Sequence, residues 1–238
     1  MQEQRYYEQA GVAVTSRSYS EYEKMFVLRT EQLAGKRVLD VSGGASSFTA
    51  EARKLGIFAE AADPMYAKTL SEIEHTGKLE IEVVAAKMEK LTNVYNWEYY
   101  GSVARHKAGR EVALDLFLQD FGAPDASGRY HAAMLPELPF DHDSFELVLC
   151  SHFLFLYEEQ FDYDFHLRAL QELVRVCKPG GQVRIYPLLN FQTKEYSRME
   201  DLMAEISQSG CIVQRNISEL PFLPGSKFYL SIDKAPGC

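Results

Sequence analysis

The sequence predicts an α/β fold: a mostly parallel, doubly wound sheet of seven strands, with the last strand antiparallel and helices on both faces. Two observations support this prediction. Apolar, β-branched runs without polar alternation recur along the chain, which is typical of parallel strands buried on both faces. Segments with apolar residues at helical spacing lie between these runs. A length of 238 residues suits a single domain that spans residues 1–238.

The first half of the chain predicts a βαβ unit flanked by helices. The capping-box pattern Ser20–Glu23 indicates a helix that ends near Gly35, within an N-terminal helical cap at residues 1–35. The unit itself comprises a strand at 37–41, a helix at 48–55 and a strand at 57–63. Residues 67–128 then show helical periodicity, and we interpret them as a helical insertion or lid.

The second half returns to alternating strands and helices. Strands are expected at 129–134, 145–150, 182–189, 211–217 and 227–233. A long helix between the strands at 145–150 and 182–189 should stop at Lys178–Gly181, where a proline and two glycines follow a cation. A second capping-box spacing, Ser197–Glu200, predicts a further helix that Gly210 ends. The last two strands should form an antiparallel pair.

Charge and composition exclude several partners. The formal net charge is −9, from 25 basic and 34 acidic residues, so nucleic acid is not expected as a partner. A secretory leader and an apolar run of membrane-spanning length are not found, so we expect a cytoplasmic protein without a membrane partner. The four cysteines form no CxxC pair, which predicts reduced thiols and no metal site.

The stretch VLDVSGGASSF at 38–48 reads as a buried strand that turns into a helix at a ligand. Backbone N–H groups at such a helix N-terminus can hold a bound group. A dinucleotide fingerprint would need a third glycine where Phe48 stands, which disfavours a nicotinamide oxidoreductase. The Gly-Lys-Ser/Thr ending of a P-loop is also absent, which disfavours phosphoryl transfer.

At this point the chain resembles the class I S-adenosylmethionine-dependent methyltransferases. The resemblance rests on VLDVSGGASSF, on Asp63 after the second strand, on LPELPFDHDSFELVLCSH (135–152) and on ELVRVCKPGGQVRI (172–185), in that order. It implies S-adenosylmethionine as cofactor, S-adenosylhomocysteine as product and a small molecule as methyl acceptor. The alternative is a non-catalytic module of the same fold that binds either adenosyl compound as a signal.

The resemblance also implies a set of cofactor contacts. The methionine end of the cofactor would lie against Asp40, Ser42, Gly43, Gly44 and Ser47. Asp63 would accept hydrogen bonds from both ribose hydroxyls, with Pro64 beside it. The adenine ring would lie near Met134 and Leu135, and Ser151 would face the cofactor from the end of the fourth strand region.

The glycine turn departs from the usual G-x-G-x-G form because its outer positions are Ser42 and Ser46. A positive φ at either serine would cost about 1 kcal/mol or more. We therefore expect a different course for this loop, with Ser46 or Ser47 as the N-cap of the following helix.

Candidate catalytic residues follow the fourth and fifth strands. His152 is the best general base in the sequence, because an ordinary imidazole titrates near neutral pH, although a packing role is an equal alternative. Tyr157 and Tyr186 could orient an acceptor through their hydroxyls, or could pack with only the tip in water.

An aromatic group predicts the acceptor site. Tyr95, Trp97 and Tyr100 in the insertion, together with Tyr19 near the N-terminus, could form a lid over a flat apolar acceptor. Helix packing and a dimer surface are the alternatives, so the sequence leaves both a monomer and a homodimer open.

Overall fold

The computed structural model describes residues 13–236. The strands are β1 (Arg37–Val41), β2 (Phe58–Ala62), β3 (Tyr130–His131), β4 (Phe145–Ser151), β5 (Cys177–Tyr186), β6 (Ile212–Ile217) and β7 (Phe228–Asp233). The α-helices are α1 (Tyr19–Phe26), α2 (Thr30–Leu33), α3 (Phe48–Lys54), α4 (Leu70–Lys90), α5 (Val103–Phe121), α6 (Tyr163–Val176) and α7 (Met199–Gln208). Short 3-10 helices lie at Pro64–Ala67, Ala126–Gly128 and Glu158–Gln160.

These strands form one sheet in the order β3-β2-β1-β4-β5-β7-β6. Neighbours from β3 to β5 are parallel, whereas β7 is antiparallel to both β5 and β6. This topology confirms the predicted fold class, including the antiparallel last strand. The order reverses direction between β1 and β4, which places the switch point of the sheet at their carboxyl ends, where ligands of such sheets bind.

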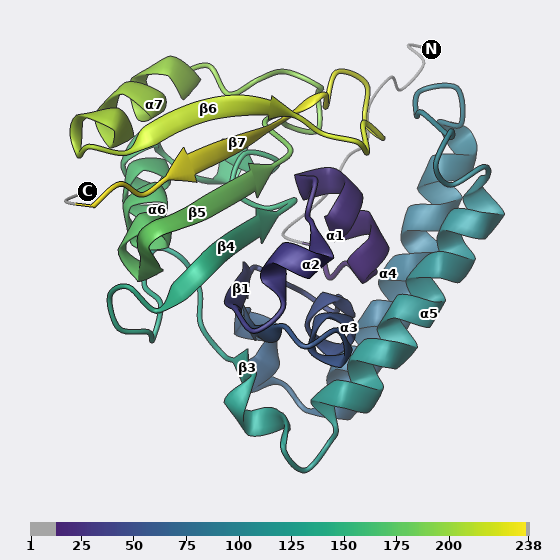
Figure 1. Cartoon of the computed structure of the whole chain (residues 1–238). Coiled ribbons are helices and arrows are strands. Elements are labelled where there is room, and N and C mark those ends of the chain that lie inside the picture. The colour runs from purple at the N-terminus through teal and green to yellow at the C-terminus, as the bar shows by residue number, and fades with distance from the viewer. Residues whose placement is uncertain (1–12, 237–238) are drawn as a thin grey trace.

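Each face of the sheet carries its own core. Helices α6 and α7 cover one face, where Leu170, Leu173 and Leu202 pack on β4 and β5. On the other face, Phe26 of α1 and Phe48 of α3 pack on the same strands. Figure 1 shows the long pair α4 and α5 outside α1 and α3, on the side away from α6 and α7. The second face is therefore covered by two layers of helices near the switch point.

The insertion folds as the predicted helical layer. Thr69 caps α4 with a capping box, and Ser102 caps α5 through a bond from the Arg105 N–H. The two helices approach closely at Gly77, where an added Cβ would lie 2.9 Å from Leu114. A smaller cluster of Met88, Leu91 and Tyr95 anchors the end of α4 beside the loop between β6 and β7.

The predicted helix ends needed correction in three places. The first capping box is Ser18 with Glu21, two residues before the expected pair, and the N-terminal helix divides into α1 and α2. The sequence pattern fitted both frames, and the buried position of Glu21 selects the earlier one. The spacing at Ser197 forms no capping box, because α7 begins at Met199 without a side-chain cap.

Two strand predictions also needed correction. The expected strand at 129–134 is only two residues long, since β3 ends at His131. The predicted helix stop at Lys178–Gly181 belongs to β5, which begins directly after α6 and shifts register against β4 between Phe145 and Leu147. Gly180 has the positive φ expected of a turn, so it makes the irregularity inside the strand possible.

Within residues 13–236, no helix combines the length and apolar composition needed to cross a membrane. Cys150 and Cys177 are buried free thiols, as predicted. Cys211 is disulfide-bonded, so the expectation of reduced thiols is wrong for that residue. The spacing of single cysteines carried no signal for this bond.

Candidate functional site

The glycine turn, residues 42–47, connects β1 to α3 at the switch point. Ser42 and Gly44 both adopt positive φ, 58° and 56°. The expectation that no serine takes this conformation is therefore wrong for Ser42, whose amide is held by a bond to the Ala62 carbonyl (2.8 Å). Ser47 is at the N-cap position of α3, as predicted, but its hydroxyl bonds Glu51 rather than a backbone N–H.

Residues 13–17, which we call the N-terminal strap, lie directly on the glycine turn. The Thr15 carbonyl accepts from the Ala45 N–H (3.0 Å), and the Arg17 carbonyl accepts from the Ser47 N–H (2.9 Å). The Ser46 hydroxyl also donates to the Arg17 carbonyl, at 2.7 Å. An added Cβ on Gly44 would lie 2.8 Å from the Thr15 oxygen, so this glycine is required by the strap itself.

The carboxyl groups of Asp40, which is buried, and of Asp63, which is partly buried, flank the turn. Asp63 accepts from the N–H groups of Met65 (2.9 Å) and Gly44 (3.0 Å). Burial raises its pKa despite these two bonds. Asp40 accepts from the Tyr22 hydroxyl at 2.9 Å, and burial raises its pKa to about 8. The Asp40 carboxyl is therefore largely protonated at neutral pH.

The other predicted cofactor contacts lie along the same edge with different exposure. Pro64 is exposed and begins the 3-10 helix after β2. Met134 is 58% exposed, whereas Leu135 is buried in the core. Ser151, at the end of β4, is buried with its hydroxyl 2.9 Å from Nδ1 of His152.

The chemistry of this edge fits an adenosyl cofactor. Each carboxylate oxygen of Asp63 accepts one backbone bond and keeps a further lone pair, and the residue is only partly buried, so ribose hydroxyls can reach it. The turn itself is closed by the chain's own groups, since an added Cβ on Gly43 would lie 2.8 Å from Asp40 and 3.0 Å from the Tyr66 hydroxyl. The donor set is thus suitable, and the strap covers the glycine turn.

A cavity opens beside the closed turn, at the ends of β4 and β5. Its volume is about 900 Å³, which includes open solvent at its mouth. Its walls come from the strap, from α4 and α5, and from the loops after β4, β5 and β6. Asp40, Gly43, Gly44 and Asp63 do not line it.

The three predicted catalytic residues all line this cavity. His152 has positive φ (53°), its N–H donates to the Tyr186 carbonyl, and its ring lies edge-on to the ring of Tyr186. Burial, followed by the charges of Arg17 and Arg110, holds the pKa of His152 well below 6.5. The Tyr157 hydroxyl accepts from the Ala13 N–H (2.9 Å), and the Tyr186 hydroxyl donates to the Leu220 carbonyl (2.6 Å).

The predicted acceptor aromatics divide into two groups. Tyr95 and Tyr100 line the cavity. Trp97 packs behind them, in edge contact with Tyr95 and with its indole N–H donating to the Thr92 carbonyl (2.6 Å). Tyr19 stacks on Phe48 in the core and does not line the cavity.

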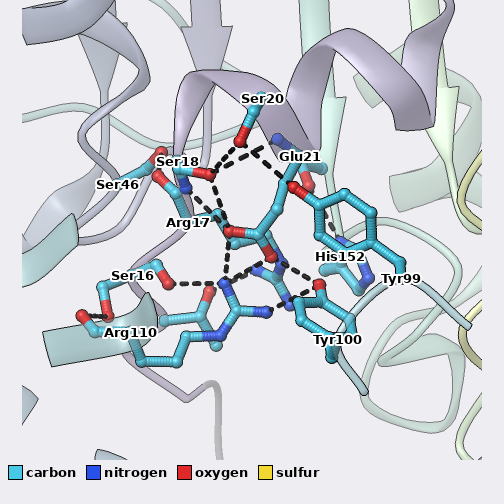
Figure 2. Close-up of polar contacts among 12 residues, drawn as sticks. Ser16, Arg17, Ser18, Ser20, Glu21, Ser46, Tyr99, Tyr100, Arg110 and His152 are labelled. Atoms are coloured by element: carbon cyan, nitrogen blue, oxygen red, sulfur yellow. Dashed lines mark hydrogen bonds and ion pairs between the residues drawn. The ribbon is translucent and has the colours of Figure 1, made fainter. Parts of the chain in front are cut away.

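A charged network that the sequence did not reveal forms one wall of the site (Figure 2). Arg110 of α5 pairs with Glu21 of α1 at 2.7 Å, and it donates to the Ser16 carbonyl at 2.7 Å. The Tyr100 hydroxyl donates to Glu21 at 2.5 Å. Although burial opposes ionisation, Arg110, Tyr100 and Arg17 hold the pKa of Glu21 below its usual range.

Arg17 belongs to the same wall but has no carboxylate partner. Its side chain donates to the Thr15 hydroxyl at 2.6 Å, and among residues 13–236 it forms no ion pair. Burial and the neighbouring Arg110 lower its pKa. The sequence could have suggested a role for Arg17 only through its position in the polar stretch SRSYSEY. It could not have suggested the pair of Arg110 with Glu21, because these residues are 89 positions apart in the chain. In the described part of the chain, no group of acidic, histidine or cysteine side chains could hold a metal ion.

Comparisons with known proteins concern the family and the fold of the chain. Residues 84–185 match the family model described as a methyltransferase domain. The uncharacterized protein MJ0045 of Methanocaldococcus jannaschii is 30% identical over 202 residues, which cover 84% of this chain and 89% of that protein.

Solved structures are more distant. The Methanococcus maripaludis protein mmp1179 is 12% identical with a TM-score of 0.49, over 92% of this chain and 85% of that one. Magnesium protoporphyrin IX methyltransferase from Synechocystis PCC 6803, with bound SAM, is 12% identical with a TM-score of 0.46, over 86% of this chain and 73% of that one. With its sheet order, its glycine turn at the switch point and its methyltransferase domain match, the chain belongs to the class I S-adenosylmethionine-dependent methyltransferase family.

Proposed function

We propose that the protein transfers a methyl group from S-adenosylmethionine to a small-molecule acceptor that binds in the cavity. The observation that carries this proposal is the position of the cavity. It opens at the ends of β4 and β5, beside the glycine turn, and it is lined by His152, Tyr157 and Tyr186. A small, aromatic-lined space suits a small acceptor, and the net charge of −9 opposes a nucleic acid.

We assign the cofactor to the edge formed by Asp40, Ser42, Gly43, Gly44 and Ser47. Asp63 and Pro64 would hold the ribose, with Met134 and Leu135 beside the adenine and Ser151 facing the cavity. The bound cofactor supplies an activated methyl carbon, so alignment of the acceptor can provide most of the acceleration. Before that, the strap must move off the glycine turn, because Thr15 and Arg17 hold its amides.

His152 serves in this proposal as a neutral proton acceptor. Its pKa lies well below 6.5 through burial and two nearby guanidinium groups, so the ring is neutral at neutral pH and one of its nitrogens is unprotonated. Its Nδ1 is held by Ser151, which leaves Nε2 for an acceptor hydroxyl. Tyr157 and Tyr186 use their hydroxyls within the protein, so they shape the pocket and position the strap and the β6–β7 loop.

Calorimetry with S-adenosylhomocysteine tests the cofactor assignment. Asp63→Ala should weaken binding roughly 10- to 150-fold, because hydrogen bonds to a charged group contribute about 1.5–3 kcal/mol. Asp164→Ala on α6 is the control, since it removes an exposed carboxylate of the same size. Equal affinity of the wild type and Asp63→Ala, with NAD binding as tightly, would refute the assignment.

Turnover separates catalysis from the regulatory alternative. Radiolabelled S-adenosylmethionine incubated with a library of small acceptors should label at least one of them, and His152→Phe should lower kcat while it leaves the Kd of S-adenosylhomocysteine unchanged. Tight cofactor binding with no labelled acceptor would instead favour a non-catalytic module that binds adenosyl compounds.

A further inference from the structure

We propose that Arg17 selects an acceptor that carries a carboxylate on a flat, apolar body. This inference rests on the proposed function, and it names the chemical class of the molecule in the cavity. It follows from the charges on the cavity wall, from the aromatic groups around them and from the separation of the cavity from Asp63.

The ion pairs on the wall leave one cation without a partner among the described residues. Arg110 and Glu21 form a complete pair, held by two direct N–O contacts of 2.7 and 2.9 Å. Arg17 remains as a partly buried guanidinium that donates only to the Thr15 hydroxyl. Glu80 also lines the cavity but makes no ion pair with Arg17, and burial raises the pKa of its carboxyl. Among the described residues of the wall, Arg17 is therefore a cation without an ion-pair partner.

An arginine in such a position favours a planar anion. A guanidinium keeps its proton even when burial lowers its pKa, so Arg17 cannot relieve the cost by neutralising, as a lysine would. Its donor fork matches the two oxygens of a carboxylate, and Thr15 occupies only one of its nitrogens. The hydrogen bonds of a bound carboxylate would therefore replace those to water that Arg17 loses on partial burial.

The neighbouring walls accept an apolar ring. Tyr95 stacks on Phe222 with a centroid distance of 4.8 Å, and His106 stacks on the same Phe222 at 5.6 Å. Burial and the two arginines lower the pKa of His106 to about 2, so this imidazole is neutral and acts as a further aromatic surface. Offset and edge contacts with these rings favour a flat ligand.

The carboxylate of the cofactor is the competing source of the same chemistry. The acceptor is favoured because Arg17 lines the cavity together with aromatic residues of the insertion and the β6–β7 loop. Asp63, Met134 and Leu135, to which the adenosine end is assigned, do not line that space. The experiment below measures both sources.

The test uses 2-naphthoate and 2-naphthamide, two probes of equal shape that differ in charge. Binding is measured by calorimetry on the full-length wild type, Arg17→Gln, Arg17→Lys and the control Arg168→Gln, which changes an exposed arginine on α6. The wild type and Arg168→Gln should prefer the naphthoate at least about 10-fold, and Arg17→Gln should abolish that preference. Arg17→Lys should retain part of it, because it keeps the charge without the fork.

Four results would overturn the proposal. The wild type could bind the two probes equally, the wild type could bind neither, or Arg17→Gln could keep the preference. The fourth result, a loss of at least 10-fold in S-adenosylhomocysteine affinity in Arg17→Gln with naphthoate binding unchanged, would assign the carboxylate to the cofactor. The naphthoate preference is measured without cofactor, so failure of the wild type to bind S-adenosylhomocysteine would refute the proposed function alone. Thermal unfolding checks that each variant folds, and the Arg17 carbonyl contacts to the glycine turn do not depend on its side chain.

Discussion

The two halves of the carboxyl edge of the sheet differ in whether their polar groups have partners within the described chain. At the ends of β1 and β2, the glycine turn and Asp63 satisfy their hydrogen bonds with the strap and with each other. At the ends of β4 and β5, the cavity leaves Arg17 without an anion and Nε2 of His152 without a hydrogen-bond partner among the described residues. Similar backbone geometry thus produces one closed half and one open half.

This difference separates polar groups that stabilise the folded chain from polar groups that are available to bind a ligand. A buried polar group that lacks a partner costs free energy, so unsatisfied groups persist where a ligand can satisfy them. The closed half must first give up contacts to its own strap, whereas the open half can accept a ligand at once. The network of Glu21 and Arg110 links the two halves, because it ties the strap to α1 and α5.

The largest expected effect comes from breaking that link. Glu21→Ala should lower the free energy of unfolding by about 3–5 kcal/mol, since it leaves the Arg110 charge buried and unpaired. Urea unfolding followed by circular dichroism measures this loss. Glu74→Ala is the matched control, because it removes a partner of Lys78 in an exposed ion pair on α4 and should cost less than about 1 kcal/mol.

A small loss in Glu21→Ala, equal to that of Glu74→Ala, would show that water reaches Arg110 and that the two halves are not linked by this pair. Arg110→Met in the Glu21→Ala background should recover part of the stability, because a neutral side chain no longer needs a partner.

The second prediction concerns pH, because the two halves titrate with opposite sign. The Asp40 pKa is raised from 3.8 to about 8 by burial, so the folded state holds a proton that the unfolded state has lost between these values. Stability from this group is therefore present below about pH 4 and declines as the pH rises to about 8. Burial lowers the His106 pKa from 6.5 to about 2, so its contribution declines as the pH falls below about 6.5.

Unfolding free energies measured from pH 4 to pH 8 separate the two groups. Asp40→Asn should remove a decline of up to about 1 kcal/mol per pH unit on the alkaline side, and His106→Phe should remove a similar decline on the acid side. Identical pH profiles of the wild type and both variants would mean that neither group is buried in solution.

The sequence predicted most of the fold because strand burial and helix periodicity are local signals. The apolar run at 145–150 and the periodicity of residues 67–128 correspond to β4 and to the pair α4 and α5. Helix ends were less predictable, since capping-box spacing occurs in two frames around Ser18 and Ser20. The choice depends on the distant Arg110, which buries Glu21.

The site was predictable where chemistry follows strand ends and unpredictable where it depends on long-range pairing. His152, Tyr157 and Tyr186 follow β4 and β5, and the topology brings them to one cavity. Arg17 could not be placed there, because its neighbours come from α5 and from the loop after β4. The positive φ of Ser42 was also missed, since the bond to the Ala62 carbonyl that accompanies it joins neighbouring strands.

The smallest expected effect tests how tightly the strap closes the glycine turn. Gly44→Ala should cost about 2–3 kcal/mol of unfolding free energy, because a Cβ at positive φ is unfavourable and would also lie 2.8 Å from the Thr15 carbonyl. Gly35→Ala is the matched control: its φ is also positive, but an added Cβ would meet nothing within 4 Å, so about 1 kcal/mol is expected. If Gly44→Ala displaces the strap instead of destabilising the domain, its unfolding free energy should equal that of Gly35→Ala. In that case faster amide exchange at Ala45 and Ser47 would reveal the released bonds, whereas equal stability with unchanged exchange would mean that the strap does not press on the turn.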